Sequence, residues 1–144
     1  VNPKVEHENF NMEGIDLSDR YLLTKQLIDR AQSDKILIFC NSTEQCIDLA
    51  KYLQSENIIS EPFHSKQLDS ERSAAVYRFH TGKTMCLVCT DIAARGMDFK
   101  DVKLVIQFQY ADNGINLLHR IGRTGRMNTT GKGCFPIISS DKLD

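Results

Sequence analysis

Residues 35–40, Lys-Ile-Leu-Ile-Phe-Cys, decide the fold class. Five apolar residues follow Lys35 without interruption, which predicts a strand buried on both faces of a sheet. Residues 42–45, Ser-Thr-Glu-Gln, then have the form of a capping box, and apolar residues recur at helical spacing from Cys46 to Leu53. A buried strand followed at once by a helix is the unit from which parallel sheets are built, so this stretch favours the α/β class.

The same alternation runs through the rest of the chain. Ser18 is a candidate N-cap for a helix that continues to about residue 31, and Asp69 is a candidate start for another. We expect further strands at 58–63, 85–89, 102–108 and 134–138, and a short helix at about 116–121. This rhythm predicts a doubly wound parallel sheet with helices on both faces. Residues 17–140 then form a single domain, between a leading segment or edge strand at 1–16 and a tail at 141–144.

Composition limits the classes of function. The 144 residues include 18 basic and 19 acidic ones, a net charge of −1, so any nucleic-acid site has to be local. No apolar run approaches the ~18 residues that span a bilayer, and the first sixteen residues are too polar for a signal peptide. The five cysteines are an odd number scattered among apolar residues, which favours buried free thiols. We therefore expect an intracellular protein in a reducing compartment, without a membrane partner.

Cys86 and Cys89 have the spacing of a zinc or redox pair. They lie inside an expected strand, however, where alternation directs residues at this separation to opposite faces. No other group of histidines, cysteines and carboxylates in the sequence has the spacing of metal ligands. The sequence therefore predicts no metal site.

The sharpest chemical signal is residues 119–126, His-Arg-Ile-Gly-Arg-Thr-Gly-Arg. They lie in a stretch, 113–140, that contains no acidic residue. Three arginines recur every third residue, and the glycines between them let the chain leave a helix, so the guanidinium groups can converge on one anion. Arginine grips phosphate in a planar, bidentate way, which favours a phosphate site. The alternative is a charged helix end that is stabilised by the helix dipole.

Residues 90–98, Thr-Asp-Ile-Ala-Ala-Arg-Gly-Met-Asp, directly follow an expected buried strand. Gly96 allows a tight bend. Thr90 and the first backbone amides of this turn are candidates to hold a phosphate oxygen, and Asp98 is a candidate acceptor for a ribose hydroxyl. An equally good interpretation is that Arg95 and Asp98 pair with each other and hold the loop.

Two further segments bear on a phosphate ligand. His64 follows an expected strand and Arg72 lies in the first turn of the next helix, so both are candidates to contact a nucleic-acid backbone, although a structural hydrogen bond is the commoner role for each. Residues 82–84, Gly-Lys-Thr, imitate the end of a P-loop, but Tyr77 stands where that loop needs glycine. If the protein uses ATP, most of the ATP site therefore lies outside this chain.

These segments together resemble a known family. Residues 119–126 are similar to motif VI of the DEAD-box RNA helicases, 90–98 to motif V, and 38–42 to motif IV. Residues 64–79 resemble the segment between motifs IV and V, and His119 at the head of motif VI favours the DEAD-box over the DEAH branch. By these motifs the chain is identified as the C-terminal RecA-like domain of a DEAD-box protein, cut from a longer enzyme.

The resemblance implies an RNA-stimulated ATPase that unwinds RNA locally, in which two RecA-like domains close around ATP and single-stranded RNA. It implies ATP with Mg²⁺ as cofactor, the metal being held mainly by the N-terminal domain, and protein activators as further partners. It assigns Arg123 and Arg126 to catalysis and ATP binding as arginine fingers, and Asp98 to ATP. It assigns RNA contacts to Asn41, Ser42, His64, Arg72, Thr90 and Gly96, and interdomain contacts to Arg95, His119 and Arg120.

Four positions depart from the family pattern: Ser65, Asp69, Gln109 and Ala111. In the family, the glutamine at the position of Asp69 contacts the motif VI histidine. We therefore hypothesise that Asp69 pairs with His119 and belongs with it to the interdomain residues. The alternatives to the helicase are a non-catalytic RNA-binding or partner-docking module and a DNA helicase domain. Because each site is only half present, we expect the isolated domain to be inactive.

Overall fold

The computed structural model describes residues 16–109 and 132–134, in which five strands form one parallel sheet in the order β2-β3-β1-β4-β5. The strands are β1 (Ile36–Cys40), β2 (Ser60–Phe63), β3 (Cys86–Thr90), β4 (Leu104–Gln107) and β5 (Lys132–Cys134). The helices are α1 (Leu17–Ala31), α2 (Thr43–Ser55), α3 (Asp69–His80) and α4 (Asp91–Ala94). The predicted doubly wound α/β fold is confirmed.

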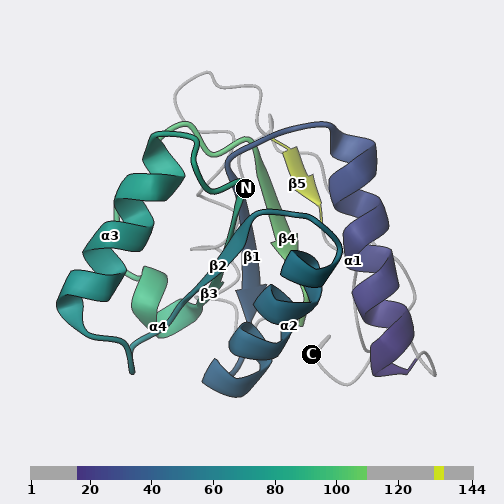
Figure 1. The fold of residues 1–144 in the computed structure, drawn as a ribbon, viewed down its shortest axis with the longest axis horizontal. Helices are drawn as coiled ribbons and strands as arrows, with labels where there is room; N and C mark the ends of the chain where they lie inside the picture. Colours follow the sequence, from purple (N-terminus) through teal and green to yellow (C-terminus); the bar gives the residue numbers. More distant parts are fainter. Residues whose placement is uncertain (1–15, 110–131, 135–144) are drawn as a thin grey trace.

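The sheet separates two hydrophobic cores, as Figure 1 shows with α1 and α2 on one face and α3 and α4 on the other. Alternation along β1 divides its residues, because Ile36, Ile38 and Cys40 join the α1–α2 core while Leu37 and Phe39 join the α3–α4 core. All five β1 residues are buried, as the uninterrupted apolar run predicted. None of the helices in the described ranges has the length and apolarity to cross a membrane.

Cys86 and Cys89 occupy opposite cores, which confirms that alternation along β3 separates the two sulfurs. Four cysteines, Cys40, Cys46, Cys86 and Cys89, are buried free thiols. Burial raises the pKa of the Cys46 and Cys86 thiols to about 12, so both are inert as nucleophiles.

Some element boundaries differ from those predicted. Helix α1 is capped by Asp16 and not by Ser18, because the Asp16 carboxylate accepts the backbone N–H of Asp19 at 3.1 Å. The second and fourth strands are shorter than expected, and β5 begins at Lys132, two residues before the predicted start. The short helix expected at 116–121 lies outside the described residues.

Two glutamine side chains from outside the edge strand β2 cover its outer backbone groups. Pro62 has no N–H to offer, and its carbonyl oxygen accepts from Gln67 Nε2 at 3.0 Å. The Ser60 carbonyl accepts from Gln54 Nε2 at 2.8 Å. The Gln67 amide also accepts the His64 N–H at 3.0 Å, so it pairs with β2 as a residue of a further strand does. These contacts protect the edge against strand addition.

Candidate functional site

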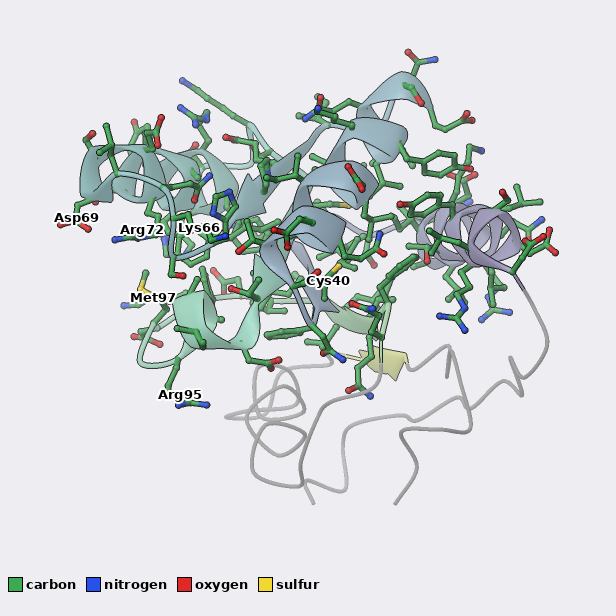
Figure 2. All side chains as sticks on the ribbon, turned by 90° about the horizontal axis from the view of Figure 1, so that it is seen from below. Cys40, Lys66, Asp69, Arg72, Arg95 and Met97 are labelled. Carbon is green, nitrogen blue, oxygen red and sulfur yellow. The ribbon has the colours of Figure 1, made fainter. Side chains whose placement is uncertain are left out.

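The carboxyl ends of the parallel strands form the edge at which ligands meet such sheets. Phe63 pairs with Cys89 and Cys40 pairs with Thr90, so β2, β3 and β1 end at one level. The segments that leave them begin with His64, Asp91 and Asn41. Figure 2 looks onto this edge and shows Lys66, Arg72, Arg95 and Met97 toward one side of it. The structure thus brings the predicted segments 41–42, 64–72 and 90–98 together.

The segment after β1 is held at both ends by hydrogen bonds. The Ser42 hydroxyl caps α2 by accepting the Gln45 N–H at 3.1 Å, which confirms this residue as the helix start. The Asn41 N–H donates to Gln109 Oε1 at 2.7 Å. Gln109, which departs from the family pattern, therefore ties the segment after β4 to the segment after β1.

The segment after β3 begins with a single helical turn and then bends at a glycine. Thr90 is the N-cap of the single-turn helix α4, and its hydroxyl accepts the Ala93 N–H at a long 3.4 Å. Gly96 has a φ of +79°, which L side chains rarely adopt, while a Cβ placed there meets nothing within 4 Å. Glycine is therefore favoured at position 96 by the backbone conformation, and not because a neighbouring atom would clash with a Cβ. Arg95 and Asp98 are exposed at the same edge.

The segment after β2 is closed around Arg72. Nη1 of its guanidinium donates to the carbonyl oxygens of His64, Ser65 and Gln67 at 3.3, 3.1 and 2.7 Å. Nη2 pairs with the Asp69 carboxylate. The structural role weighed for Arg72 is therefore present, while its contact with RNA stays a prediction.

His64 is only 8% exposed, and its Nδ1 is buried without a hydrogen-bond partner in the described part of the chain. Burial, followed by the charges of Lys66 and Arg72, lowers the pKa of the imidazole below 6.5. The ring is therefore neutral at neutral pH. A buried polar atom without a hydrogen-bond partner lowers the free energy of unfolding by about 1–3 kcal/mol. The buried Nδ1 of His64 therefore reduces the stability of the fold.

The motif VI residues His119, Arg120, Arg123 and Arg126 lie outside the described residues, as does Ala111. The hypothesised pair of Asp69 with His119 stays a prediction for the same reason. Among the described residues, no group of three or more His, Cys, Asp or Glu side chains can hold a metal ion.

Sequence reasoning missed three features around β2 and α3. The first is the pair of hydrogen bonds by which the Gln67 amide covers the outer side of β2. The available signal was Pro62, because proline within a strand indicates an edge strand. The second is the ion pair of Arg78 with Glu61, at 2.7 and 2.6 Å, which joins α3 to the edge strand. The third is the position of Lys66, which the fold brings to within 3.8 Å of the Glu44 carboxylate in the first turn of α2.

Comparison with known proteins agrees with this geometry. The helicase conserved C-terminal domain family matches residues 19–128. The probable ATP-dependent RNA helicase DDX52 of Rattus norvegicus is 33% identical over 123 residues, which are 85% of this chain and 21% of that protein. The chain spans about a fifth of the length of the curated relatives it matches.

Solved structures show the same fold. The DEAD-box protein SrmB of E. coli, determined bound to RraA, is similar with a TM-score of 0.85 and 26% identity, over 96% of this chain and 80% of that one. Domain 2 of the DEAD-box helicase Mss116p, determined bound to an RNA duplex, has a TM-score of 0.73 and 28% identity, over 95% and 54% of the two chains.

The chain belongs to the family of the helicase conserved C-terminal domain. Its sequence relatives and structural neighbours place it, within that family, with the DEAD-box RNA helicases. The predicted resemblance is thus confirmed for the domain and its fold.

Proposed function

We propose that this chain is the C-terminal half of an ATP-dependent RNA helicase and supplies one wall of a cleft that closes on ATP and single-stranded RNA. The observation that supports this most directly is the gathering of segments 41–42, 64–72 and 90–98 at the carboxyl edge of the sheet. The similarity to Mss116p domain 2, whose structure was determined on RNA, supports the same function.

In this proposal Asn41, Ser42, Thr90 and the backbone around Gly96 face RNA phosphates. Contacts of this kind bind the backbone and carry little sequence specificity. Asp98 accepts from the ribose of ATP, while Arg95, His119 and Arg120 serve contacts between the domains. The four buried free thiols support a reducing, intracellular compartment.

Arg123 and Arg126 complete the ATP site as arginine fingers in this proposal. They neutralise charge that develops on the transferred phosphoryl group, and such residues contribute on the order of 10³-fold or more to turnover elsewhere. Mg²⁺, held mainly by the N-terminal domain, supplies further neutralisation of the phosphates when ATP is bound. A protein activator docked on this domain is part of the proposal, because SrmB was determined bound to another protein, the regulator of ribonuclease activity A.

The test is ATP hydrolysis by the full-length protein alone, with single-stranded RNA, and with DNA of the same sequence. We expect stimulation by RNA only. Stimulation by both nucleic acids equally indicates the DNA helicase alternative, and no turnover in any condition indicates a non-catalytic binding module. Arg123→Ala and Arg126→Ala should each reduce RNA-stimulated turnover about 10³-fold with an unchanged unfolding midpoint.

The isolated chain of residues 1–144 provides a second test. We expect no ATP hydrolysis from it, since the proposal gives it only one wall of the cleft. Measurable turnover from the purified chain contradicts the division of the site between two domains.

A further inference from the structure

A groove of about 740 Å³ lies at the amino ends of the strands, on the face of the sheet that α1 and α2 cover (Figure 1). It is lined by the ends of both helices and by residues just before β1, β3 and β4. The segments that follow β1, β2 and β3 leave the other ends of the strands. The groove is therefore remote from the edge that the proposed function assigns to ATP and RNA.

The floor of this groove is apolar. Ile28 in α1 and Ile58 after α2 are 3% and 7% exposed, and Met85, directly before β3, packs against the same core but is only partly buried. The Met85 N–H donates to the Ile59 carbonyl at 3.0 Å, and its carbonyl accepts the Ile36 N–H at 2.9 Å. The apolar surface of Met85 is thus held in a fixed place, where a ligand side chain can cover it.

The charged side chains that line the groove are mostly acidic and exposed. They are Asp29, Asp34 and Glu56, against a single lining cation, Lys103. Lys25 pairs with Asp29 at 2.9 Å. Within residues 16–109 and 132–134, the Asp34 and Glu56 carboxylates make no ion pair, so both are available to a cationic ligand.

The backbone adds to this negative potential. Helix α1 ends at Ala31 and α2 at Ser55, so the C-terminal ends of two helices, each with a partial negative charge, meet the groove. A basic residue is favoured in the last turn of a helix, but α2 has none there and is followed at once by Glu56. Negative charge at this place opposes helix stability, and sequences break such local rules mostly at functional sites.

These charges discriminate between the possible occupants of the groove. They repel the phosphates of RNA. They also repel residues 1–16 of the chain itself, which contain four acidic residues and one lysine. A cationic protein segment is attracted instead, and an apolar residue within that segment finds the partly buried Met85 between the two carboxylates and the core.

We propose that this groove docks a segment of a partner protein in which a large apolar residue is flanked by lysines or arginines. The apolar residue packs on Met85, and its basic neighbours pair with Asp34 and Glu56. This inference goes beyond the proposed function and does not rest on it, because the groove lies at the opposite edge of the sheet. A partner bound there leaves the carboxyl edge accessible.

A library of random peptides tests the chemistry of the partner. Twelve-residue peptides displayed on phage are selected on the full-length protein and counter-selected on its double variant Asp34→Lys, Glu56→Lys. We expect the surviving sequences to share an apolar residue flanked by lysine or arginine. If no peptide survives the counter-selection, or if the survivors lack basic residues, the proposal is wrong.

The affinity of one surviving peptide, measured by fluorescence anisotropy, locates its contacts. Asp34→Lys and Glu56→Lys should each weaken binding about fivefold at low salt, and Met85→Gln about tenfold at every salt concentration. A peptide with glutamates in place of its basic residues should bind the double variant more tightly than the unsubstituted protein. An unchanged affinity in Met85→Gln overturns the apolar contact.

Asp48→Lys is the matched control. It reverses an exposed charge of the same helix, about 12 Å from Glu56 along the axis, which exceeds the screening length at about 0.1 M salt. The affinity for the peptide should therefore change less than about twofold. A loss as large as that of Glu56→Lys shows a general charge effect and overturns the docking site.

Two further measurements keep the proposal falsifiable. If a charge reversal impairs folding, Asp34→Asn and Glu56→Gln replace it and should each weaken peptide binding about twofold; an unchanged affinity in both overturns the charge pairing. Sedimentation velocity of the full-length protein without peptide tests a second copy as the occupant. Self-association that Glu56→Lys abolishes would assign the groove to an interface between copies and overturn the proposal.

Discussion

The segments that leave β2 and β3 lie at the same edge of the sheet but are built in opposite ways. Residues 64–72 are closed by Arg72 and Gln67, which together make five hydrogen bonds to the loop and the adjacent strand. Residues 90–98 contain the long cap bond at Thr90, backbone bonds from the Arg95 and Met97 N–H groups to the carbonyl oxygens of Asp91 and Ala94, and a glycine at positive φ. The first segment is held by side chains that reach its backbone, whereas the second presents the exposed charged groups of Arg95 and Asp98 at the edge. Substitutions should therefore act on stability in the first segment and mainly on activity in the second.

The largest expected effect on stability comes from Arg72→Met. The three carbonyl oxygens lose a charged donor, and such hydrogen bonds contribute about 1.5–3 kcal/mol, so we expect the free energy of unfolding to fall by about 2–4 kcal/mol. Chemical denaturation of the isolated domain measures this change. Arg95→Met, the same substitution at an exposed position of the second segment, should lower the denaturation midpoint less. Equal losses in both variants would break the comparison.

A second effect is expected from Gln67→Ala. It removes the two bonds by which the amide covers β2, so the free energy of unfolding should fall by about 1–2 kcal/mol. The uncovered edge should also favour association of the protein through strand pairing, which light scattering detects. Gln54→Ala, which removes only one such bond, should show the smaller change in both measurements. A larger loss of stability in Gln54→Ala would contradict the inference that Gln67 is the main side chain covering β2.

Gly96→Ala tests the second segment, residues 90–98. An L residue at φ +79° is strained, and we expect a loss of about 1 kcal/mol in the free energy of unfolding. Gly82→Ala, at φ +84° and equally open, is the matched control at the opposite edge. Both variants should lose similar stability, but only Gly96→Ala should reduce RNA-stimulated ATPase of the full-length protein. Equal ATPase in the two variants counts against a role of residues 90–98 in the site.

The smallest effect is the pH dependence that His64 contributes. Its pKa in the fold lies below 6.5, the value of an unburied histidine, so the unfolded chain takes up a proton first as the pH falls. The stability from the neutral, buried ring is therefore complete above pH 6.5 and is lost as the pH falls through that value toward the lower pKa. Comparison of unfolding midpoints at pH 7.5 and 5.5, with His64→Gln as reference, should show the smaller pH dependence in the variant. If the unfolding midpoint of His64→Gln depends on pH as strongly as that of the unsubstituted protein, the pH dependence comes from other groups.

Much of the fold was predictable because the signals are local. The apolar runs that became β1 and β3 are buried over their full length, and the Ser42 cap begins α2 as its sequence indicated. The prediction that Ser18 caps the first helix was wrong, because Asp16 offers a stronger acceptor two residues earlier. Motif patterns were sufficient for the family, since several short segments had to match in order and spacing.

The candidate site was predictable only in part. Glycine at 96 was recognised as a bend because its residue type is itself the signal. The clamp by Gln67 and the occupied guanidinium of Arg72 were not, because each depends on carbonyl oxygens that converge only after β2, α3 and the loop between them have packed.

The sequence by itself determined the class of fold and the family, because periodicity, caps and ordered motifs are properties of neighbouring residues. Only the tertiary structure decided which of the polar side chains at the sheet edge are engaged by the protein and which are exposed to a ligand. Arg72 and Lys66 are both cations of one short segment, and the sequence does not rank them. Packing distinguishes them, because it surrounds Arg72 with carbonyl oxygens and leaves the side chain of Lys66 69% exposed beside the Glu44 carboxylate.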